Sequence, residues 1–468
     1  MNMNISKDLY AVHKNLSACS AAFLEFVKDN PESLIRSSFP ALEIDYHHIR
    51  LQSWPTFIDK KTKEEIGEVG VKVCNLIKSV PRRFFSNDPT RVSQYYEISE
   101  HMARIMLDGV DETHIDNLLG RGDFIFSPSG LKCLEYNIAG NIGGWEAEIW
   151  MPLYLKTPIL SRFLQQYKYK EKLINENFLS IFLTHLIRTA LDKFPGSTEC
   201  SVINTAFVSR TQVVDQGVLS YLNRLYDNIV QLRGRNTRLK GRIILCDYHD
   251  LEVVDDVVFY KGEPVHVLVE RYGGIVPPAF TKVFKKGNVI IYNGPISGLM
   301  SNKFNLAVLS ENRDSHIFTP EEREIIKKHI PWTRKISPGE TTFAGKKVNL
   351  EDFILSHREQ LVVKPSIGFG GKEVYIGKNM DETRWREIVK SAVRRKVWLV
   401  QELVESNPYL YQTGVNGCAP HHAVWGFFVF GSRYAGGWVR VIPVHGKGQG
   451  VINTSRGAEE SVIFEIDE

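Results

Sequence analysis

The sequence predicts a protein of mixed α/β class that also contains separate helical and strand-rich parts (α+β elements). Three observations lead to this class. Apolar and charged residues recur at helical spacing in the first quarter of the chain, short apolar runs alternate with helices in the middle, and closely spaced apolar runs dominate the last third. Alternating strands and helices are typical of a sheet that is at least partly parallel.

Length and composition indicate a globular protein with several subdomains. The chain has 468 residues, of which 43% are hydrophobic and 24% are charged, and one core rarely serves so long a chain. The formal net charge is only +4, without the basic patch typical of proteins that bind DNA or RNA. No signal core and no apolar run of about 18 residues is present. We therefore expect neither a nucleic-acid nor a membrane partner.

The six cysteines show no spacing typical of a zinc site or of a disulfide framework. This pattern favours a reducing, cytoplasmic location. The sequence leaves the oligomeric state open.

The first 115 residues are expected to be mostly helical. Helical spacing covers residues 8–30, 61–80 and 93–118, and Pro31, Pro55 and Pro81 are expected to separate the helices.

A β-hairpin follows, with polar residues at the ends of its strands. One strand contains Arg121 and Asp123, and the other contains Glu135 and Asn137. The two arms can bring Asp123 and Glu135 side by side, with Asn137 on the same face. Oxygen ligands of this kind suit Mg²⁺, and Arg121 could neutralise a phosphate. The hairpin is therefore a candidate magnesium site, and an exposed hairpin with an ordinary salt bridge is the alternative.

The middle and the last third differ in their predicted strands. In the middle, a helical pattern is followed by apolar runs with helices between them, which predicts an α/β domain. After residue 360 the apolar runs are closer together and predict a sheet-rich part with one helix. The helices are expected at residues 173–194 and 381–395, and the strands at 201–208, 241–246, 264–270, 288–292, 361–364, 374–376, 397–400, 423–430 and 436–442.

A glycine-rich loop follows the strand that ends in Lys364. Its glycines can adopt backbone angles that point several N–H groups at an anion. The loop differs from a Walker P-loop, because the first glycine and the Ser or Thr after the lysine are missing. Phosphate binding is one interpretation, and a glycine hairpin that joins two strands is the other. The residues concerned are Ser366, Gly368, Gly370 and Gly371.

About thirty residues further on, an apolar strand turns polar at Gln401, Glu402 and Leu403. A connecting segment at this point could bind adenine through its backbone and ribose through a carboxylate. An exposed strand end is the alternative.

In this order, the motifs resemble those of a known family. The chain is similar to the synthetase domain of glutathionylspermidine synthases and related circularly permuted ATP-grasp proteins over about residues 115–468. In that family an Arg-x-Asp segment precedes a Glu-Tyr-Asn segment, and both precede the nucleotide-binding lobe. Here these segments are residues 121–123 and 135–137, and further motifs match residues 294–309, 363–371, 400–403 and 428–440.

The resemblance implies an ATP-grasp fold with a pre-ATP-grasp α/β domain, and it implies roles for the site residues. Asp123, Glu135 and Asn137 would bind Mg²⁺. Arg121 would contact the γ-phosphate, and Arg440 would stabilise the tetrahedral intermediate. The loop at residues 366–371 would close over ATP as a lid. The residues implied to bind ATP are Lys303, Lys364, Ser366, Gly368, Gly370, Gly371, Gln401, Glu402 and Leu403.

The chain departs from the family after Arg440. The family usually has an acidic residue soon after this arginine, whereas this chain continues Val-Ile-Pro-Val-His through residue 445. Asn141, Trp145 and Glu146 follow the metal-binding strand and could face the acceptor substrate, although a core position is the alternative for the tryptophan. Asn453 and Arg456 lie in a glycine-rich final loop that could close over substrate.

His421 and His422 could suggest a metal site. No carboxylate lies at ligand spacing, so we expect exposed histidines instead.

The implied function is an ATP- and Mg²⁺-dependent carboxylate–amine ligase. It would form an amide or peptide bond through an acyl phosphate on a small amino acid, peptide or polyamine. A small-molecule kinase and a non-catalytic ATP-binding scaffold are the alternatives. The expected parts are a helical region (1–115), a metal-binding hairpin that belongs to the ATP-grasp core (116–160), a pre-ATP-grasp-like domain (161–335) and a nucleotide-binding lobe with its lid (336–468).

Overall fold

The computed structural model combines helices with several sheets, so the predicted mixed α/β class is confirmed. It describes residues 6–36, 49–108, 114–115, 117–194, 200–209, 216–233, 238–272, 275–368, 370–445 and 450–468. The predicted domain boundaries stay predictions.

Helices dominate the described N-terminal residues, as predicted. Asp59 caps helix α3 by accepting a hydrogen bond from Thr62 N (2.6 Å). Pro81 does not end this helix but lies inside it, which corrects the prediction. The helical bond that proline removes is offset by packing in the next turn, where the buried Phe85 ring lies 5.1 Å from that of Tyr95. The elements are α1 (Lys7–Leu16), α2 (Ala18–Asp29), β1 (Thr56–Asp59), α3 (Lys60–Phe85), α4 (Pro89–Tyr96) and α5 (Glu100–Leu107).

The expected helical stretch at 93–118 is covered by α4 and α5 only as far as Leu107. Residues 109–113 and 116 of that stretch lie outside the described residues.

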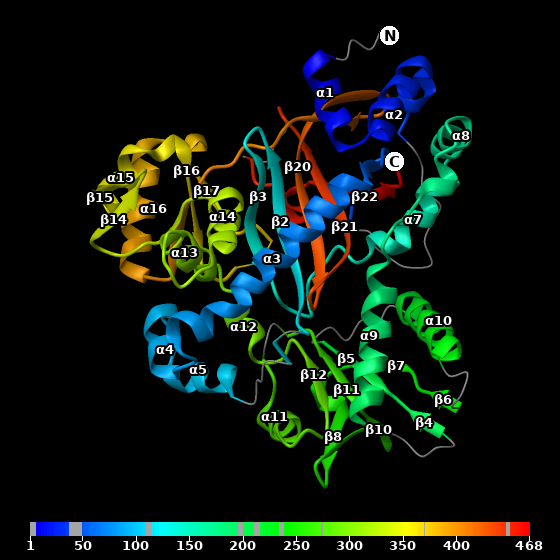
Figure 1. Ribbon diagram of the computed structural model, residues 1–468, viewed down its shortest axis with the longest axis vertical. Coiled ribbons are helices and arrows are strands. Elements are labelled where there is room, and N and C mark those ends of the chain that lie inside the picture. Colours follow the sequence, from blue (N-terminus) through cyan, green and yellow to red (C-terminus); the bar gives the residue numbers. More distant parts are fainter. Residues whose placement is uncertain are drawn as a thin grey trace.

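A seven-stranded sheet forms the centre of the molecule (Figure 1). Its order is β1–β22–β21–β20–β2–β3, with β19 also paired to β20, and only β1–β22 is parallel. The predicted hairpin supplies β2 and β3 and thus lies beside strands from the last third of the chain. The strands are β2 (Leu119–Ser127), β3 (Gly130–Asn137), β19 (Tyr409–Thr413), β20 (Gly417–Phe430), β21 (Arg433–Pro443) and β22 (Glu459–Ile466).

Helix α3 crosses one face of this sheet (Figure 1). The approach is close, because Tyr136 Oη donates to the carbonyl oxygen of Gly70 at 3.1 Å. Successive side chains of a strand point to opposite faces, so Glu135 and Asn137, on either side of Tyr136, point away from α3. The second face of the sheet is therefore available for a site.

The middle of the chain contains a parallel sheet with the order β12–β11–β5–β7, as predicted. Helix α9 connects it to the central sheet, because its Phe182 ring lies 6.4 Å from Phe207 and 5.3 Å from Phe430. The elements of this region are α7 (Ala147–Lys156), α8 (Pro158–Gln166), α9 (Phe178–Lys193), β4 (Cys200–Val202), β5 (Thr205–Val208), α10 (Gln216–Arg233), β6 (Arg238–Lys240), β7 (Ile243–Cys246), β8 (Leu251–Val254), β9 (Val257–Tyr260), β10 (Glu263–Val265), β11 (Val267–Glu270), α11 (Pro278–Lys285) and β12 (Ile290–Tyr292).

A lobe with its own sheet follows, in which the antiparallel strands have the order β13–β18–β16–β17. The lobe has its own core, in which Trp385 is fully buried and donates from Nε1 to the carbonyl oxygen of Ile354 (3.0 Å). Its elements are β13 (Thr333–Lys335), β14 (Glu340–Phe343), β15 (Lys346–Asn349), α15 (Leu350–Ser356), β16 (Leu361–Pro365), β17 (Tyr375–Ile376), α16 (Glu382–Arg395) and β18 (Trp398–Glu402). The preceding helices α12 (Ser297–Met300), α13 (Phe304–Glu311) and α14 (Pro320–His329) bury their apolar side chains in the main core instead.

None of the helices in the described part of the chain combines the length and hydropathy needed to cross a bilayer. The five cysteines whose side chains the structure describes are all free thiols.

Candidate active site

Strand register places the predicted side chains in one row across the central sheet. Glu135 on β3 pairs with Asp123 on β2, and Asp123 pairs with Gly426 on β20. Gly426 pairs in turn with Trp438 on β21. Directly paired residues lie on one face of a sheet, so this row lies on the face opposite α3. The predicted pairing of Asp123 with Glu135 is confirmed.

Asp123 lies between two arginines at the centre of the row. It is 4% exposed. Arg121 Nε donates to its Oδ1 (2.8 Å) and Arg121 Nη2 to its Oδ2 (3.1 Å), while Arg440 Nη2 donates to Oδ2 (2.7 Å). Arg440 lies 317 positions from Asp123 in the sequence, yet both belong to one buried ion cluster with Arg121. The structure brings Arg440 into the site together with Arg121.

The indole of Trp438 lies against both arginines. The guanidinium carbons of Arg121 and Arg440 lie 5.7 and 5.0 Å from the centre of its ring. Gly426 leaves room for this arrangement, because a Cβ at that position would lie only 2.2 Å from Trp438 Nε1. An aromatic face attracts cations, so Trp438 orients both guanidinium groups.

Glu135 lies at the end of the row beside two lysines. Its Oε1 accepts a hydrogen bond from Asn137 Nδ2 (3.2 Å), and its Oε2 lies 3.4 Å from Lys303 Nζ. Burial by itself would raise the pKa of Glu135, but the charges of Lys303 and Lys364 outweigh burial and hold this pKa well below its usual value. Glu135 is therefore a carboxylate at neutral pH.

Lys364 is held by the hairpin and by β18. Its Nζ donates to the carbonyl oxygen of Leu134 (2.9 Å) and to Gln401 Oε1 (2.9 Å). Burial lowers the pKa of Lys364 to about 8. Gln401, expected as an exposed strand end if it had no function, is instead 2% exposed and also donates to Thr333 Oγ1 (3.0 Å).

The glycine loop lies against the final loop of the chain. Gly370 and Gly371 have φ values of +68° and +65°, which glycine adopts at little cost. Ser455 Oγ donates to the carbonyl oxygen of Gly370 (2.8 Å), and Arg456 Nη2 donates to that of Gly371 (3.2 Å). Position 369 of the glycine loop lies outside the described residues. These contacts bring residues 454–456 to the rim of the site.

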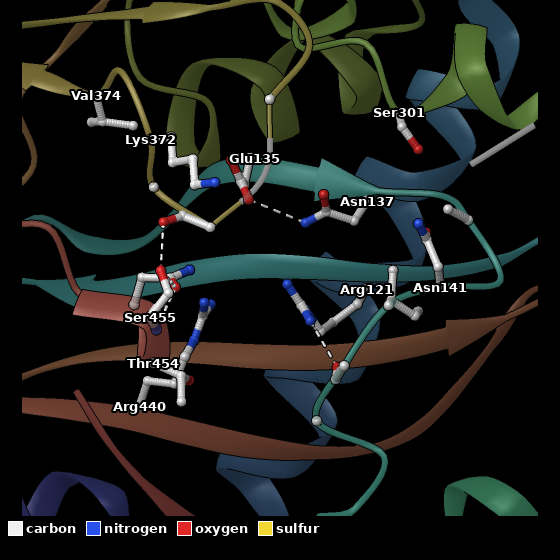
Figure 2. Close-up of a pocket in the computed structure, with 18 of the residues that line it drawn as sticks. Arg121, Glu135, Asn137, Asn141, Ser301, Lys372, Val374, Arg440, Thr454 and Ser455 are labelled. Atoms are coloured by element: carbon white, nitrogen blue, oxygen red, sulfur yellow. Dashed lines mark hydrogen bonds between the residues drawn. The ribbon is translucent and has the colours of Figure 1, made fainter. Parts of the chain in front are cut away.

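These groups line two adjoining cavities, one of about 490 Å³ and one of about 140 Å³. In Figure 2, Arg121, Glu135 and Asn137 from the hairpin, Arg440 from β21 and Lys372 after the glycine loop surround the larger cavity. The predicted residues along the larger cavity are Arg121, Glu135, Asn137, Lys303, Lys364, Gly368, Gly370, Gly371 and Arg440. The smaller cavity adds Asp123, Gln401, Glu402 and Leu403.

Ser366 is the predicted residue that lines neither cavity. It is 3% exposed, and its carbonyl oxygen accepts a hydrogen bond from Lys303 N (2.9 Å). Ser366 therefore fixes the backbone of Lys303 rather than facing either cavity.

In the segment proposed as an adenine-binding hinge, the backbone N–H groups of residues 402 and 403 already donate hydrogen bonds to other parts of the chain. Glu402 N donates to Trp332 O (2.8 Å), and Leu403 N donates to Gln360 O (2.7 Å). Recognition of a base at this segment would therefore rely on other backbone groups. Its role as a hinge stays a prediction.

The side chains present fit a Mg²⁺ ion that also binds phosphate oxygens. Among the described residues, no group of three or more His, Cys, Asp or Glu side chains could hold a metal by itself. Glu135 and Asn137 present a carboxylate and an amide to the cavity, and Asp123 Oδ1 can take a second partner besides Arg121. Mg²⁺ commonly takes one or two carboxylates and completes its shell with phosphate and water.

Of the residues proposed to contact substrate, Asn141, Glu146 and Asn453 line the larger cavity. Trp145 does not, and it lines a separate apolar cavity with Phe178 and other core residues. Arg456 contacts the glycine loop instead.

Sequence reasoning did not identify Trp438, Lys372 and Glu460, which also line the larger cavity. Glu460 is on β22, a strand that was not predicted. The short apolar run at residues 462–464, followed by Ile466, was the available signal for that strand, but no local pattern shows which face Glu460 occupies.

The expectation of exposed histidines is wrong for His421. This side chain is 1% exposed, its Nδ1 lies 2.8 Å from the carbonyl oxygen of Ala419, and its ring meets Tyr411 edge to face. The reason is the register of β19 with β20, which places Tyr409 opposite His421 on the same face and Tyr411 against its ring, whereas His422 points to the other face and is partly buried.

A solved structure shares the fold of this chain over nearly its whole length. The apo form of a glutathione synthetase-like effector (GSS30) from Globodera pallida has a TM-score of 0.56 at 13% identity, with 98% of each chain covered. A putative γ-glutamylcysteine synthetase from Methylobacillus flagellatus has a TM-score of 0.42 at 12% identity, with 84% of this chain and 87% of that chain covered. No protein-family model and no curated protein sequence matches this chain. At these identities, the first likeness establishes a common fold.

Proposed function

We propose that this chain is an ATP- and Mg²⁺-dependent carboxylate–amine ligase with an ATP-grasp fold. One observation carries the proposal. The hairpin near residue 130 and the glycine loop near residue 370 line the same cavity, so carboxylates and an arginine face the lysines and the loop that would hold phosphates. The fold shared with a protein described as glutathione synthetase-like supports the same class of reaction.

The triphosphate is proposed to lie between the two lysines and the glycine loop. Lys303 Nζ lies 3.4 Å from Glu135 and 3.2 Å from the carbonyl oxygen of Gly368, so a phosphate would meet the cation and the loop together. Lys364 supplies a second cation from β16. Mg²⁺, held by Glu135 and Asn137 with Asp123 beside them, would neutralise phosphate charge and polarise the transferred group.

The reacting carboxylate is proposed to lie between Arg121 and Arg440. These arginines share Asp123 and the ring of Trp438, so their positions are set before substrate binds. Charges fixed in advance stabilise a transition state without the cost of reorganisation. Transfer of the γ-phosphoryl group to the carboxylate gives an acyl phosphate, an amine then attacks its carbonyl carbon, and phosphate leaves.

The test is an ADP-release assay with pools of amino acids, small peptides and polyamines, followed by mass spectrometry of the product. A product that equals two substrates minus one water supports ligation. Gain of phosphate by one substrate supports the kinase alternative. ATP binding without ADP release above background supports the non-catalytic scaffold, and either of these outcomes refutes the ligase.

A further inference from the structure

Two carboxyl groups, one buried and one partly buried, lie in the larger cavity at the end opposite the lysines. Glu146 and Glu460 both line this cavity, and Glu460 is 3% exposed. Glu460 is on β22, while Glu135 is on β3, four strand-to-strand steps away in the sheet. Four steps amount to about 19 Å at the usual strand spacing. The cavity thus has a phosphate-binding end rich in lysine and a separate acidic end.

The arginines between these two ends do not pair with the acidic end. Arg440 is the register partner of Glu460, yet its Nη2 donates to Asp123 (2.7 Å). Arg121 donates to Asp123 and to the carbonyl oxygen of Gly143 (2.7 Å).

Glu146 and Glu460 are held by neutral groups. Glu146 Oε2 accepts a hydrogen bond from Gly144 N (2.7 Å), and Glu460 Oε1 accepts one from Thr454 Oγ1. Among the described residues, no ion pair forms at either carboxyl. Cations act on these groups only without direct pairing: the charges of Arg271 and Arg121 act on Glu146, and those of Arg440 and Arg121 act on Glu460. A carboxylate that is shielded from water and has no directly paired cation is unfavourable, so a ligand that brings a positive charge and N–H donors would be stabilised here.

The protonation behaviour of both groups agrees with this geometry. Burial raises the pKa of Glu146. Burial, together with the charge of Glu146, raises the pKa of Glu460 to about 7, against the opposing effects of the hydrogen bond from Thr454 and the charges of Arg440 and Arg121. A carboxyl group of this kind can both bind an ammonium ion and accept a proton near neutral pH.

We infer that Glu146 and Glu460 form the subsite for the acceptor substrate, a protonated primary amine, and that Glu460 accepts the proton that the amine must lose before it attacks. This inference rests on the proposed ligase function. The strand order then gives the reaction a direction. Phosphate lies toward β3, the acyl carbon lies between the arginines, and the amine approaches from β22, on the side away from the leaving phosphate.

The proton and electron balance is complete without a further reactant. R–NH₃⁺ gives one proton to the Glu460 carboxylate. The nitrogen lone pair then forms the C–N bond, and the C–O bond to phosphate breaks. The second proton on nitrogen leaves with the phosphate as hydrogen phosphate.

The first experiment measures amine binding to the full chain by thermal shift. The probe is n-butylammonium chloride, with tetramethylammonium chloride at equal concentration as the ionic control. The variants are Glu460→Gln and Glu146→Gln, and the matched control is Glu459→Gln, one residue away on the opposite face of β22, where Glu459 pairs with Arg36 at 2.8 Å. Wild type and the control should respond alike, and each subsite variant should need about 10–100-fold more probe, because a hydrogen bond to a charged group is lost.

The second experiment separates the amine step from the phosphoryl-transfer step. Hydroxylamine is uncharged at neutral pH and traps acyl phosphates as hydroxamates without using an ammonium subsite. The full chain is given ATP, Mg²⁺ and pooled amino-acid and small-peptide carboxylates, with hydroxylamine or with the pooled amines. The Glu460→Gln and Glu146→Gln variants should keep hydroxamate formation and lose amide formation with amines.

The outcomes are distinct for the two proposals. Equal butylammonium responses in all four proteins, no response in wild type, or equal loss of hydroxamate and amide would overturn the amine subsite. Absence of ATP-dependent hydroxamate from wild type would instead count against the ligase function, and the binding experiment would still decide the subsite.

Discussion

Replacement of Gly426 by alanine tests whether the packing of Trp438 positions the two arginines. The new Cβ would lie 2.2 Å from Trp438 Nε1, 2.7 Å from Trp438 Cδ1 and 3.1 Å from Arg121 Cδ. Contacts between such atoms are normally about 3.5 Å or more, so the indole must move by about 1 Å.

The surroundings leave the indole little room for that movement. Trp438 is 3% exposed, and a Cβ on Gly144 would also lie 2.2 Å from its ring, which shows how tightly the backbone encloses it. We expect Gly426→Ala to lower the free energy of unfolding by about 1–3 kcal/mol, the usual cost of overpacking. A shift of about 1 Å in both guanidinium groups should lower ATP-dependent hydroxamate formation by about 100-fold.

The assay compares urea denaturation and hydroxamate formation in wild type and three variants. The matched control is Gly70→Ala in the middle of α3, where the new Cβ would make an ordinary 3.5 Å contact with Val429. Alanine at this helical position should stabilise the helix by up to about 1 kcal/mol. The Gly426→Ala/Trp438→Phe double variant, with a smaller ring, should recover part of the lost stability. Gly426→Ala with wild-type stability and activity would refute the proposed positioning.

Three further predictions concern charged groups of the site. Burial raises the pKa of Glu460 from 4.5 to about 7, so the folded state binds this proton more tightly and wild-type stability falls as pH rises through that range. Glu460→Gln should remove this fall, which is on the order of 3 kcal/mol at pH 8. If urea denaturation gives the same change in unfolding free energy between pH 5 and pH 8 for wild type and for Glu460→Gln, the prediction is contradicted. Burial lowers the pKa of Lys364 to about 8, so ATP affinity measured by calorimetry should fall as pH rises above 8. The Lys364→Met variant should bind ATP weakly at every pH. A wild-type ATP affinity that does not change with pH would exclude a role of the Lys364 charge in ATP binding. Chelation of Mg²⁺ by EDTA should abolish ADP release, and Glu135→Gln should raise the Mg²⁺ concentration needed for half-maximal release by about tenfold or more, whereas an unchanged Mg²⁺ dependence would remove Glu135 from the metal site.

Much of the site could be predicted because its residues repeat with the period of a strand. Arg121, Asp123, Glu135 and Asn137 occur at intervals of two along the two arms of one hairpin, and the short turn between the arms leaves few possible registers. The glycine loop could be located for a similar reason, because a run of glycines after a strand is a local signal. Both predictions needed only neighbouring residues.

Features that depend on long-range pairing could not be predicted in the same way. Arg440 meets Asp123 only because β20 separates their strands at a position occupied by a glycine, Gly426. Glu460 reaches the cavity only through the register of β22 with β21. A shift of one residue in that register would turn Glu460 to the other face, and no segment of the chain specifies the register by itself.

The sequence by itself determined the α/β class, the hairpin with its carboxylates and the glycine loop, because local periodicity and turn residues encode them. Tertiary structure decided that these segments share one cavity, that Trp438 orients two arginines, and that the far end of the cavity is acidic. The physical reason is that strand pairing and side-chain packing between distant segments minimise free energy over the whole chain, whereas a pattern in the sequence reports only on its neighbours.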